Sequence, residues 1–419
     1  MKKTLADFNF FYSLALPITG YGTLCHYRTL TIRGKENIPV GEHYILAPCH
    51  QNALMDPMIV LQITRSATVF LARADIFKKP VARFFLTWLR ISPVYRIRDG
   101  RDQLGRNEEI FHNAREVLEK GVPLCLMAEG THNHRHQLLP LVKGMFRIAG
   151  ETQRTLGDKP LYIVPVGLDY DDYEAVLHNV CCNIGKPIDI RQYMEEYNEH
   201  QPVALNHMRA DLTAALKGVI HQVRSDERYD DEYAYCHQHT QETLRAQHLR
   251  NNAWGRFMAR KQLSEQFDTM DEEQQARCLD EGAAYAAECK RRKVPMWFAS
   301  SGWSKGTSLL AALAVLATVG VIVAVPNLLK WWLLSNLAVY FPTHIIPKHK
   351  IKDPQFRSSI NYGIRLGSQL LYVLVAVIVT LCCRGWRLAL LMLILGMMSA
   401  HVTPRLYALL RNIGYSCRN

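Results

Sequence analysis

The sequence lacks the regular cysteine spacing of a disulfide framework or a zinc site. It has 11 cysteines among 419 residues, an odd number, with adjacent pairs at Cys181/Cys182 and Cys382/Cys383. Small disulfide-stabilised domains and zinc-binding domains space their cysteines at recurring intervals. We therefore expect thiols that are mostly reduced and buried, in a chain whose length suggests two or three structural units.

The N-terminus lacks a small-residue cleavage site of the kind that ends a signal peptide. Lys2 and Lys3 precede an apolar stretch from Phe8 to Leu24, but polar residues, glycines and Pro17 interrupt it. A secretory signal has an unbroken apolar region followed by small residues. We predict that residues 1–27 form an uncleaved segment that lies on a membrane.

The basic residues lack an accompanying nucleic-acid recognition motif. The formal net charge is +12, which indicates anionic partners such as nucleic acid, a membrane surface or phosphorylated substrates. The strongest local bias runs from Arg65 to Arg106, with ten arginines and lysines against three aspartates. Without a recognition motif, nucleic-acid binding is the weakest of these alternatives.

One stretch presents a histidine and an aspartate just after an apolar strand. Tyr44 to Ala47 is typical of a buried strand, and Pro48 disfavours direct continuation into a helix. His50 and Asp56 are therefore expected in the turn and first helical residues that follow. A carboxylate that holds one ring nitrogen makes histidine a better base for a hydroxyl proton. Taken alone, the pair fits a capping aspartate and a solvated histidine better than a catalytic pair.

Strand and helix patterns alternate through the first half of the chain, which predicts an α/β domain. The expected strands are 29–33, 44–47, 69–72, 92–95, 122–127, 161–167 and 180–188, and the expected helices are 76–89, 107–119 and 202–223. The helix over 76–89 has apolar and aromatic residues at helical spacing with basic residues beside them. This pattern fits a core helix and a helix lying in a bilayer interface about equally, and the aromatic content and basic flank suit the interface.

Two arginines follow the strand at 92–95. Arg96 is expected at the same end of the sheet as His50, and Arg98 points the same way if the segment stays extended. A planar guanidinium donates two parallel hydrogen bonds to phosphate and stays charged. We predict Arg96, with Arg98 as second choice, as a phosphate-binding residue.

Polar residues also end the strand at 122–127. Glu129 is placed to accept a substrate hydroxyl, Gly130 allows the backbone to approach a ligand closely, and Thr131 completes the AEGT sequence. The histidines at 132, 134 and 136 alternate, but no fourth ligand is apparent and the segment resembles an exposed loop. We expect no metal there.

Four segments together resemble the motifs of the phospholipid/glycerol acyltransferase (PlsC-like) family, in that family's order. They are CHQNALMDP at 49–57, SPVYRIR at 92–98, AEGT at 128–131 and IVPVG at 163–167. The resemblance covers roughly residues 28 to 190. It implies that His50 and Asp56 are the catalytic pair, that Arg96 binds phosphate, and that Glu129, Gly130 and Thr131 belong to the acceptor site.

The chain departs from the family pattern at two places. Five residues separate His50 from Asp56, whereas four is the commonest family spacing, and Ala128 replaces the usual proline. The longer spacing resembles a branch that includes glycerol-3-phosphate acyltransferases. These departures loosen the prediction of the substrate more than that of the chemistry.

Long apolar runs are confined to the C-terminal part. Residues 307–325 carry no charge over a length that can span a bilayer, and further apolar blocks lie at 331–341, 370–383 and 388–400. We predict two helical hairpins, with the basic segment 349–365 between them on the cytoplasmic side. A buried helical domain is the alternative.

The predicted architecture has four parts. Residues 1–27 lie on the membrane, 28–224 form an acyltransferase domain with an α/β sheet and flanking helices, 225–300 are a polar helical connector, and 301–419 are an all-α transmembrane hairpin region. The protein would be integral to the membrane, with its active site on the cytoplasmic side.

The predicted reaction moves a fatty acyl group from acyl-CoA or acyl carrier protein to a hydroxyl of lysophosphatidate in phospholipid biosynthesis. No cofactor is expected, since the acyl donor is a substrate. Glycerol-3-phosphate or a non-phosphate amino-acid lipid are alternative acceptors. A non-catalytic membrane scaffold is the alternative from another class, although four polar residues at predicted strand ends, His50, Asp56, Arg96 and Glu129, argue against it.

Overall fold

The computed structural model describes residues 6–7, 9–64, 67–78, 80–94, 106–174, 177–324, 332–334 and 356–418. The chain divides into two compact units. The first comprises Met1–Thr23, Thr31–Asp169 and Cys181–Gln222, and the second comprises Leu24–Leu30, Tyr170–Val180 and Val223–Asn419. The fold-class prediction of an α/β sheet with flanking helices and a C-terminal helical region is confirmed.

The sheet has the order β1-β7-β6-β2-β5-β3-β4, with β8 antiparallel to β6. Its strands are β1 Thr29–Arg33, β2 His43–Pro48, β3 Val69–Arg73, β4 Ile91–Val94, β5 Leu124–Leu126, β6 Leu161–Tyr170, β7 Asn179–Ile184 and β8 Ile188–Asp189. Strand β2 runs parallel to both neighbours, pairing Ile45 with Leu124 of β5 and with Ile163 of β6. Its central position explains why its side chains are apolar, since both of its faces are covered.

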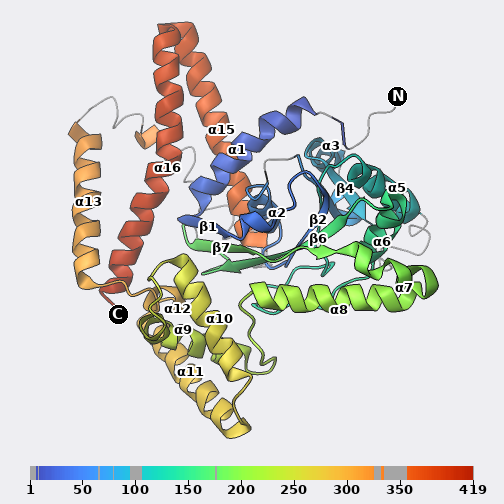
Figure 1. The fold of residues 1–419 in the computed structure, drawn as a ribbon. Coiled ribbons are helices and arrows are strands. Elements are labelled where there is room, and N and C mark those ends of the chain that lie inside the picture. The colour runs from blue at the N-terminus through green and yellow to red at the C-terminus, as the bar shows by residue number, and fades with distance from the viewer. Residues whose placement is uncertain are drawn as a thin grey trace. The chain divides into compact units, whose positions relative to one another are not determined.

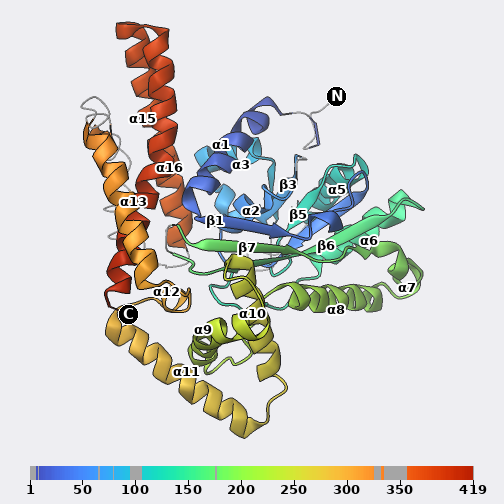
Figure 2. The same cartoon turned by 60° about the vertical axis from the view of Figure 1, so that its left-hand side comes forward.

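Helices cover both faces of this sheet. Helix α8 lies along one face and α2 on the other (Figures 1 and 2). The helices of this part are α1 Phe10–His26, α2 Met55–Val60, α3 Pro80–Trp88, α5 Arg106–Glu119, α6 Gly144–Leu156, α7 Met194–Glu199 and α8 Gln201–Val219. Short 3₁₀ turns occur at Lys35–Asn37 (η1), Ala74–Phe77 (η2) and Ile190–Tyr193 (η4).

The predicted helix over 76–89 is shorter in the structure. A 3₁₀ turn ends at Phe77 and α3 begins at Pro80. Proline suits the first helical position because its missing N–H would have no partner there, whereas inside a helix it removes a hydrogen bond. The apolar period was correct, but the proline places the helix start four residues later than expected.

Arg90 connects the N-terminal segment to the edge of the sheet. Its Nη2 donates to the carbonyl oxygen of Asp7 at 2.5 Å, and its guanidinium lies 5.2 Å from the ring centroid of Tyr12 in α1. Helix α1 nevertheless keeps Phe10 and Leu14 more than half exposed. These apolar side chains are compatible with the predicted membrane-lying role of residues 1–27, which stays a prediction.

Gly167, in the IVPVG segment of β6, allows another part of the backbone to approach the sheet closely. A Cβ atom at Gly167 would lie 2.2 Å from the carbonyl oxygen of Val219, the last residue of α8. That carbonyl also accepts a hydrogen bond from Asn183 Nδ2 of β7 at 3.2 Å. Because Gly167 has no Cβ, the C-terminal end of α8 can pack directly against β6 at this position.

The second unit is helical apart from Leu24–Leu30 and Tyr170–Val180, which include the ends of β1, β6 and β7. Its helices are α9 Tyr229–Ala246, α10 Ala253–Phe267, α11 Glu272–Arg292, α12 Met296–Ala299, α13 Lys305–Ala324, α15 Arg357–Arg384 and α16 Trp386–Ser416. Helix α9 packs against both α10 and α11. Arg260 of α10 is buried and donates to Asp171 Oδ1 at 3.2 Å, with Arg256 3.6 Å from Oδ2. These helices fall in the stretch 225–300 that was predicted as a connector, and Arg260 ties α10 to Asp171 through a buried ion pair.

Among the described residues, α13, α15 and α16 are long and apolar enough to cross a membrane. Helices α15 and α16 pack side by side and join at Gly385, whose φ is 88° (Figures 1 and 2). Gln369 Nε2 of α15 donates to the carbonyl oxygen of Gly396 in α16 at 2.6 Å. The three helices support membrane association.

The basic segment predicted between two hairpins, 349–365, is described only from residue 356 onwards. Residues 357–365 belong to α15, because the helical pattern continues through their scattered arginines. The expected partner of the first hairpin, 331–341, lies outside the described residues except for 332–334.

Replacing Gly167 tests the close approach of α8. Gly167→Ala should destabilise the folded protein by about 1–3 kcal/mol, because the added methyl group overlaps the Val219 carbonyl. Gly218→Ala is the matched control, since nothing lies within 4 Å of its Cβ position and alanine favours a helix. Thermal unfolding should show a lower midpoint for Gly167→Ala alone. Equal midpoints would contradict the close approach of the Val219 carbonyl to Gly167.

Candidate active site

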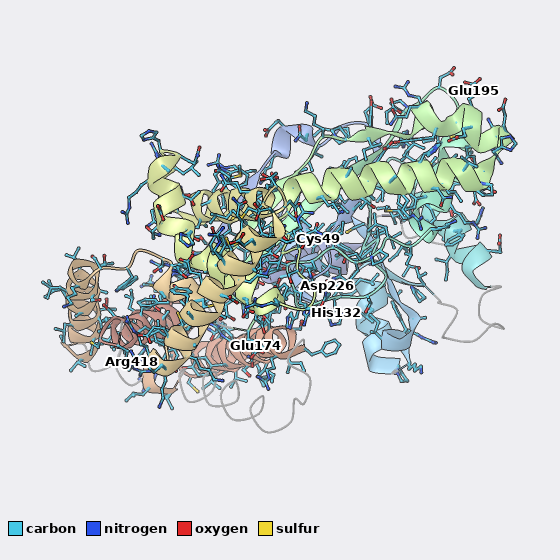
Figure 3. All side chains as sticks on the ribbon, turned by 90° about the horizontal axis from the view of Figure 1, so that it is seen from below. Cys49, His132, Glu174, Glu195, Asp226 and Arg418 are labelled. Atoms are coloured by element: carbon cyan, nitrogen blue, oxygen red, sulfur yellow. The ribbon has the colours of Figure 1, made fainter. Side chains whose placement is uncertain are left out.

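The candidate site lies where adjacent parallel strands end. His50 follows the end of β2 by two residues and Glu129 follows the end of β5 by three. Figure 3 marks the two segments by Cys49, which precedes His50, and by His132, which follows the AEGT sequence. Parallel neighbours bring their carboxyl ends to one edge of a sheet, so residues far apart in sequence meet there.

Asp56 holds His50 in one orientation. The Nδ1 atom of His50 lies 2.7 Å from Asp56 Oδ2, and the same oxygen accepts hydrogen bonds from the backbone N–H groups of Gln51 and Asn52 at 2.8 Å each. Asp56 is fully buried in the first turn of α2, where the helix dipole favours a negative charge. The carboxylate acts as acceptor, so Nδ1 carries the proton and Nε2 is left as the base.

The long spacing between His50 and Asp56 requires an unusual backbone conformation. Ala53 has φ of 41°, in the left-handed region that side chains with a Cβ rarely adopt. The turn closes with a hydrogen bond from Met55 N–H to the Asn52 carbonyl oxygen at 2.8 Å. This turn brings the histidine and the aspartate together across the five intervening residues.

Glu129 contacts backbone amides. Its Oε1 accepts from the N–H of His50 at 2.6 Å, and its Oε2 accepts from the N–H of Leu139 at 2.8 Å. Burial raises the pKa of Glu129 to about 8, although both amide hydrogen bonds favour the charged form. This geometry supports a positioning role toward His50, alongside the predicted contact with an acceptor hydroxyl.

The segment after Glu129 wraps around His50. Gly130 has φ of 66°, and a Cβ there would lie 3.2 Å from Val142 Cγ1, so glycine is required for this turn. Asn133 N–H donates to the His50 carbonyl oxygen at 3.0 Å. Thr131 is half-buried beside this turn.

His132 lies beside His50, with their ring centroids 5.4 Å apart. Its position directly after the AEGT motif is the sequence signal for this closeness to the site. A second imidazole next to the proposed base contributes to the shape and polarity of the site.

Cys49 carries a nucleophilic thiol next to His50 in the chain, and this thiol is unsuited to forming an acyl-enzyme. Burial raises the pKa of its thiol well above the usual range, with Glu129 and Asp56 adding to the rise. The Sγ atom accepts from the Leu168 N–H at 3.1 Å. A protonated, buried thiol is a poor nucleophile, so the arrangement favours direct attack by the acceptor hydroxyl.

Arg96 and Arg98 lie outside the described residues, so their phosphate-binding role stays a prediction. Strand β4, which leads to them, is described and is parallel to β3. Near this strand, α3 exposes 57% of Phe84. An apolar side chain beside a basic stretch is compatible with contact with a lipid interface.

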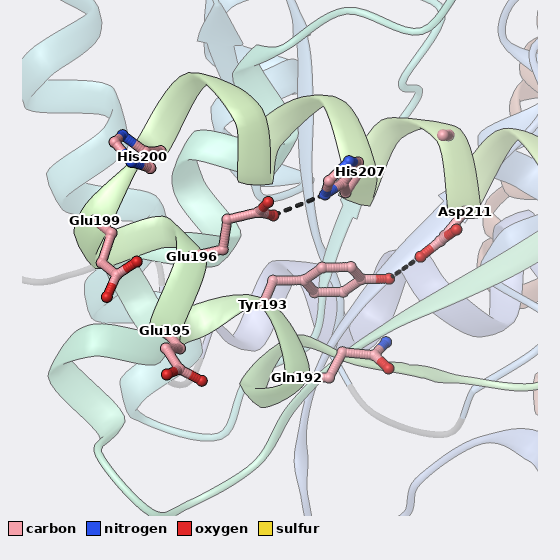
Figure 4. Close-up of a pocket in the computed structure, with 9 residues that line it drawn as sticks. Gln192, Tyr193, Glu195, Glu196, Glu199, His200, His207 and Asp211 are labelled. Carbon is pink, nitrogen blue, oxygen red and sulfur yellow. Dashed lines mark hydrogen bonds and ion pairs between the residues drawn. The ribbon is translucent and has the colours of Figure 1, made fainter.

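A pocket elsewhere in the first unit does not suit an anionic acceptor. It lies between η4, α7 and α8, where His207 Nδ1 is 2.7 Å from Glu196 and the Tyr193 hydroxyl donates to Asp211 at 2.6 Å (Figure 4). Its lining residues are Gln192, Tyr193, Glu195, Glu196, Glu199, His200, His207, Ala210 and Asp211. Four carboxylates would repel a phosphate, and His50 is not among the lining residues.

The loop prediction for the three alternating histidines was wrong for His136, which is buried. Its Nε2 lies 3.3 Å from Asp169 Oδ1, and His221 Nδ1 lies 3.8 Å from the same oxygen. Asp169, two residues after the IVPVG segment, and His221, just after α8, carry no sequence signal that pairs them with His136, because only the tertiary packing brings the three together. His132 and His134 remain half-buried in the loop.

Comparison with known proteins identifies the class of the domain. The model of the acyltransferase family matches residues 29–169. The chain is 26% identical over 155 residues to 1-acyl-sn-glycerol-3-phosphate acyltransferase BAT2, chloroplastic, of Brassica napus, covering 35% of this chain and 43% of that protein. It is 24% identical over 123 residues to 1-acyl-sn-glycerol-3-phosphate acyltransferase LPAT1, chloroplastic, of Arabidopsis thaliana, covering 29% and 33%.

Among solved structures, the chain is similar to the 1-acyl-sn-glycerophosphate (LPA) acyltransferase PlsC from Thermotoga maritima. The two are 22% identical with a TM-score of 0.33, and the match covers 48% of this chain and 81% of that chain. The chain spans less than half the length of each of the two plant proteins that it matches. The resemblance to the acyltransferase family is confirmed for residues 29–169, which form an acyltransferase domain.

Variants of Glu129 separate positioning of the base from binding of the acceptor. Glu129→Ala leaves the half-buried N–H groups of His50 and Leu139 without their acceptor, and kcat should fall about 10- to 100-fold as His50 shifts. Glu129→Gln should recover part of this loss, because its amide oxygen accepts one of the two bonds.

The control is Glu116→Ala, which removes only an exposed contact with Lys120. Steady-state kinetics with both substrates measures the outcome. An unchanged kcat with a raised acceptor KM would instead support the acceptor-binding role that the sequence predicted.

Proposed function

We propose that the protein is a membrane-bound O-acyltransferase that moves a fatty acyl group from a thioester to a hydroxyl of lysophosphatidate. The observation that carries the proposal is the contact between His50 Nδ1 and Asp56 Oδ2 at 2.7 Å, within the domain that matches the acyltransferase family. The aspartate is fully buried while the His50 side chain keeps 16% of its surface exposed. A fixed base that still reaches solvent suits proton removal from an incoming alcohol.

In the proposed transfer the acyl group passes directly from the thioester to the acceptor hydroxyl, without an acyl-enzyme. The acceptor hydroxyl oxygen attacks the thioester carbonyl carbon while His50 Nε2 takes the hydroxyl proton. The tetrahedral intermediate then collapses, the C–S bond breaks, and the leaving thiolate receives the proton from the imidazolium. Asp56 stabilises the imidazolium between these two proton transfers.

The tetrahedral intermediate carries a negatively charged oxygen, the oxyanion, that hydrogen-bond donors would stabilise. In this proposal the backbone amides of residues 50–52 are not those donors. The N–H of His50 donates to Glu129, and those of Gln51 and Asn52 donate to Asp56. These groups hold the catalytic pair in place. Donors for the oxyanion must therefore come from another part of the site.

Exposed apolar surface favours lysophosphatidate over a small acceptor. Phe84 of α3 and Phe10 and Leu14 of α1 are more than half exposed. Such residues suit a face that rests in the lipid interface, from which an acceptor already carrying one chain would enter. The names of the two plant relatives agree with this acceptor.

Glycerol-3-phosphate is the second candidate acceptor. The five-residue spacing between His50 and Asp56, accommodated at Ala53, favours it. Both acceptors carry the phosphate that Arg96 would bind. In either case acyl-CoA or acyl carrier protein would supply the acyl group, no cofactor would take part in the transfer, and the active site would face the cytoplasm.

Removing the base tests the chemistry. His50→Ala should reduce kcat by about 10²- to 10⁴-fold, the contribution typical of a positioned general base. Asp56→Asn should have a comparable or milder effect, since the amide still fills the space. The control is His112→Ala on the exposed face of α5. A folded His50→Ala protein with near-native turnover would refute the role of His50 as the base, whereas a folded wild-type protein without acyl transfer would favour a non-catalytic scaffold.

Removing the phosphate contact tests the acceptor class. Arg96→Ala should raise the acceptor KM about 10- to 100-fold, as expected for loss of a charge-assisted hydrogen bond, and leave the donor KM nearly unchanged. Arg83→Ala, an exposed arginine of α3, is the control for general loss of basic charge. Assays with lysophosphatidate and glycerol-3-phosphate compare the two acceptors. An unaltered acceptor KM would favour a non-phosphate alcohol.

A further inference from the structure

Three metal-ligating side chains from separate segments meet inside the first unit. His136 follows the AEGT motif, Asp169 lies near the end of β6, and His221 lies just after α8. All three are buried, and their ligand atoms lie within 4.8 Å of one another. The imidazole rings of the two histidines have centroids 5.1 Å apart.

The spacing of this cluster differs from that of a hydrogen-bonded histidine and aspartate. The distances from Asp169 Oδ1 are 3.3 Å to His136 Nε2 and 3.8 Å to His221 Nδ1, whereas the His50–Asp56 pair is at 2.7 Å. Ligand atoms bound at about 2.0–2.1 Å around a tetrahedral zinc ion lie roughly 3.3 Å from each other. The wider separation therefore matches groups arranged around an ion better than groups bonded to each other.

We propose that His136, Asp169 and His221 bind one divalent transition-metal ion, with Zn²⁺ as the preferred ion. Two neutral imidazoles and one carboxylate are donors that zinc accepts, and a water molecule would complete the tetrahedron. The ion would also balance the charge of a carboxylate that is 3% exposed.

The backbone already fixes two of the three ligands relative to each other. Gly167 lies two residues before Asp169, and Val219 lies two residues before His221. The close approach of Gly167 to the Val219 carbonyl therefore sets the spacing of both ligands. His136 is the ligand whose position depends on a loop.

The ion would have a structural role, separate from the transfer of the acyl group. His136 lies in the same segment as Leu139, whose N–H donates to Glu129, and Glu129 accepts from the N–H of His50. Binding the ion would fasten this segment to β6 and to the end of α8. The inference does not depend on the proposed function, because metal content is measurable in an inactive protein.

The test uses full-length protein purified in detergent, with zinc measured by elemental mass spectrometry. The wild-type protein and the inactive His50→Ala variant should each hold about one Zn²⁺ per chain. His136→Ala and His221→Ala should lose it. His134→Ala, a half-buried histidine of the same loop outside the cluster, should retain it and serves as the matched control.

A second measurement covers variants that fail to fold. Wild-type protein stripped with a chelator should melt at a lower temperature, recover on addition of Zn²⁺, and develop visible absorption bands with Co²⁺. Zinc retained by both folded cluster variants would place the ion elsewhere and overturn the proposal. So would wild-type protein with no zinc, no Co²⁺ bands and no response to the chelator, which would leave a purely hydrogen-bonded cluster.

Discussion

The buried carboxylate of Asp56 is the group on which the arrangement of the site depends. One of its oxygens accepts from two backbone amides and from the imidazole of His50. A buried charge is tolerated only when donors compensate it, and here the compensating donors include the proposed base itself. The same contacts thus keep the carboxylate inside the protein and orient the histidine toward solvent.

Around this centre, the parallel sheet supplies the remaining parts of the site. Strands β5, β2 and β6 are neighbours, so the segments that follow them converge at one edge. Because these segments lie close together, Glu129 in the segment after β5 accepts a hydrogen bond from the backbone N–H of His50. The site is therefore a network of hydrogen bonds between strand ends, and its precision derives from the rigidity of the sheet.

The strands and the pair His50 and Asp56 could be predicted from the sequence, because apolar runs and local motifs carry that information. The start of α3 was misplaced because Pro80 was read as part of a continuous apolar period. The orientation of Glu129 toward backbone amides depends on the loop around it, which no local pattern encodes. Asp169 and His221 were missed for the same reason, since only tertiary packing brings them to His136.

The contact between Gln369 and Gly396 has a consequence for how the C-terminal helices enter a bilayer. Separating α15 from α16 would leave the Gln369 amide without the Gly396 carbonyl, in hydrocarbon that offers no replacement for that hydrogen bond. A Cβ at Gly396 would lie 2.4 Å from Val373 Cγ2, so the glycine also allows close packing of the two helices. With only Gly385 between them, the two helices would insert as one hairpin rather than one after the other during synthesis.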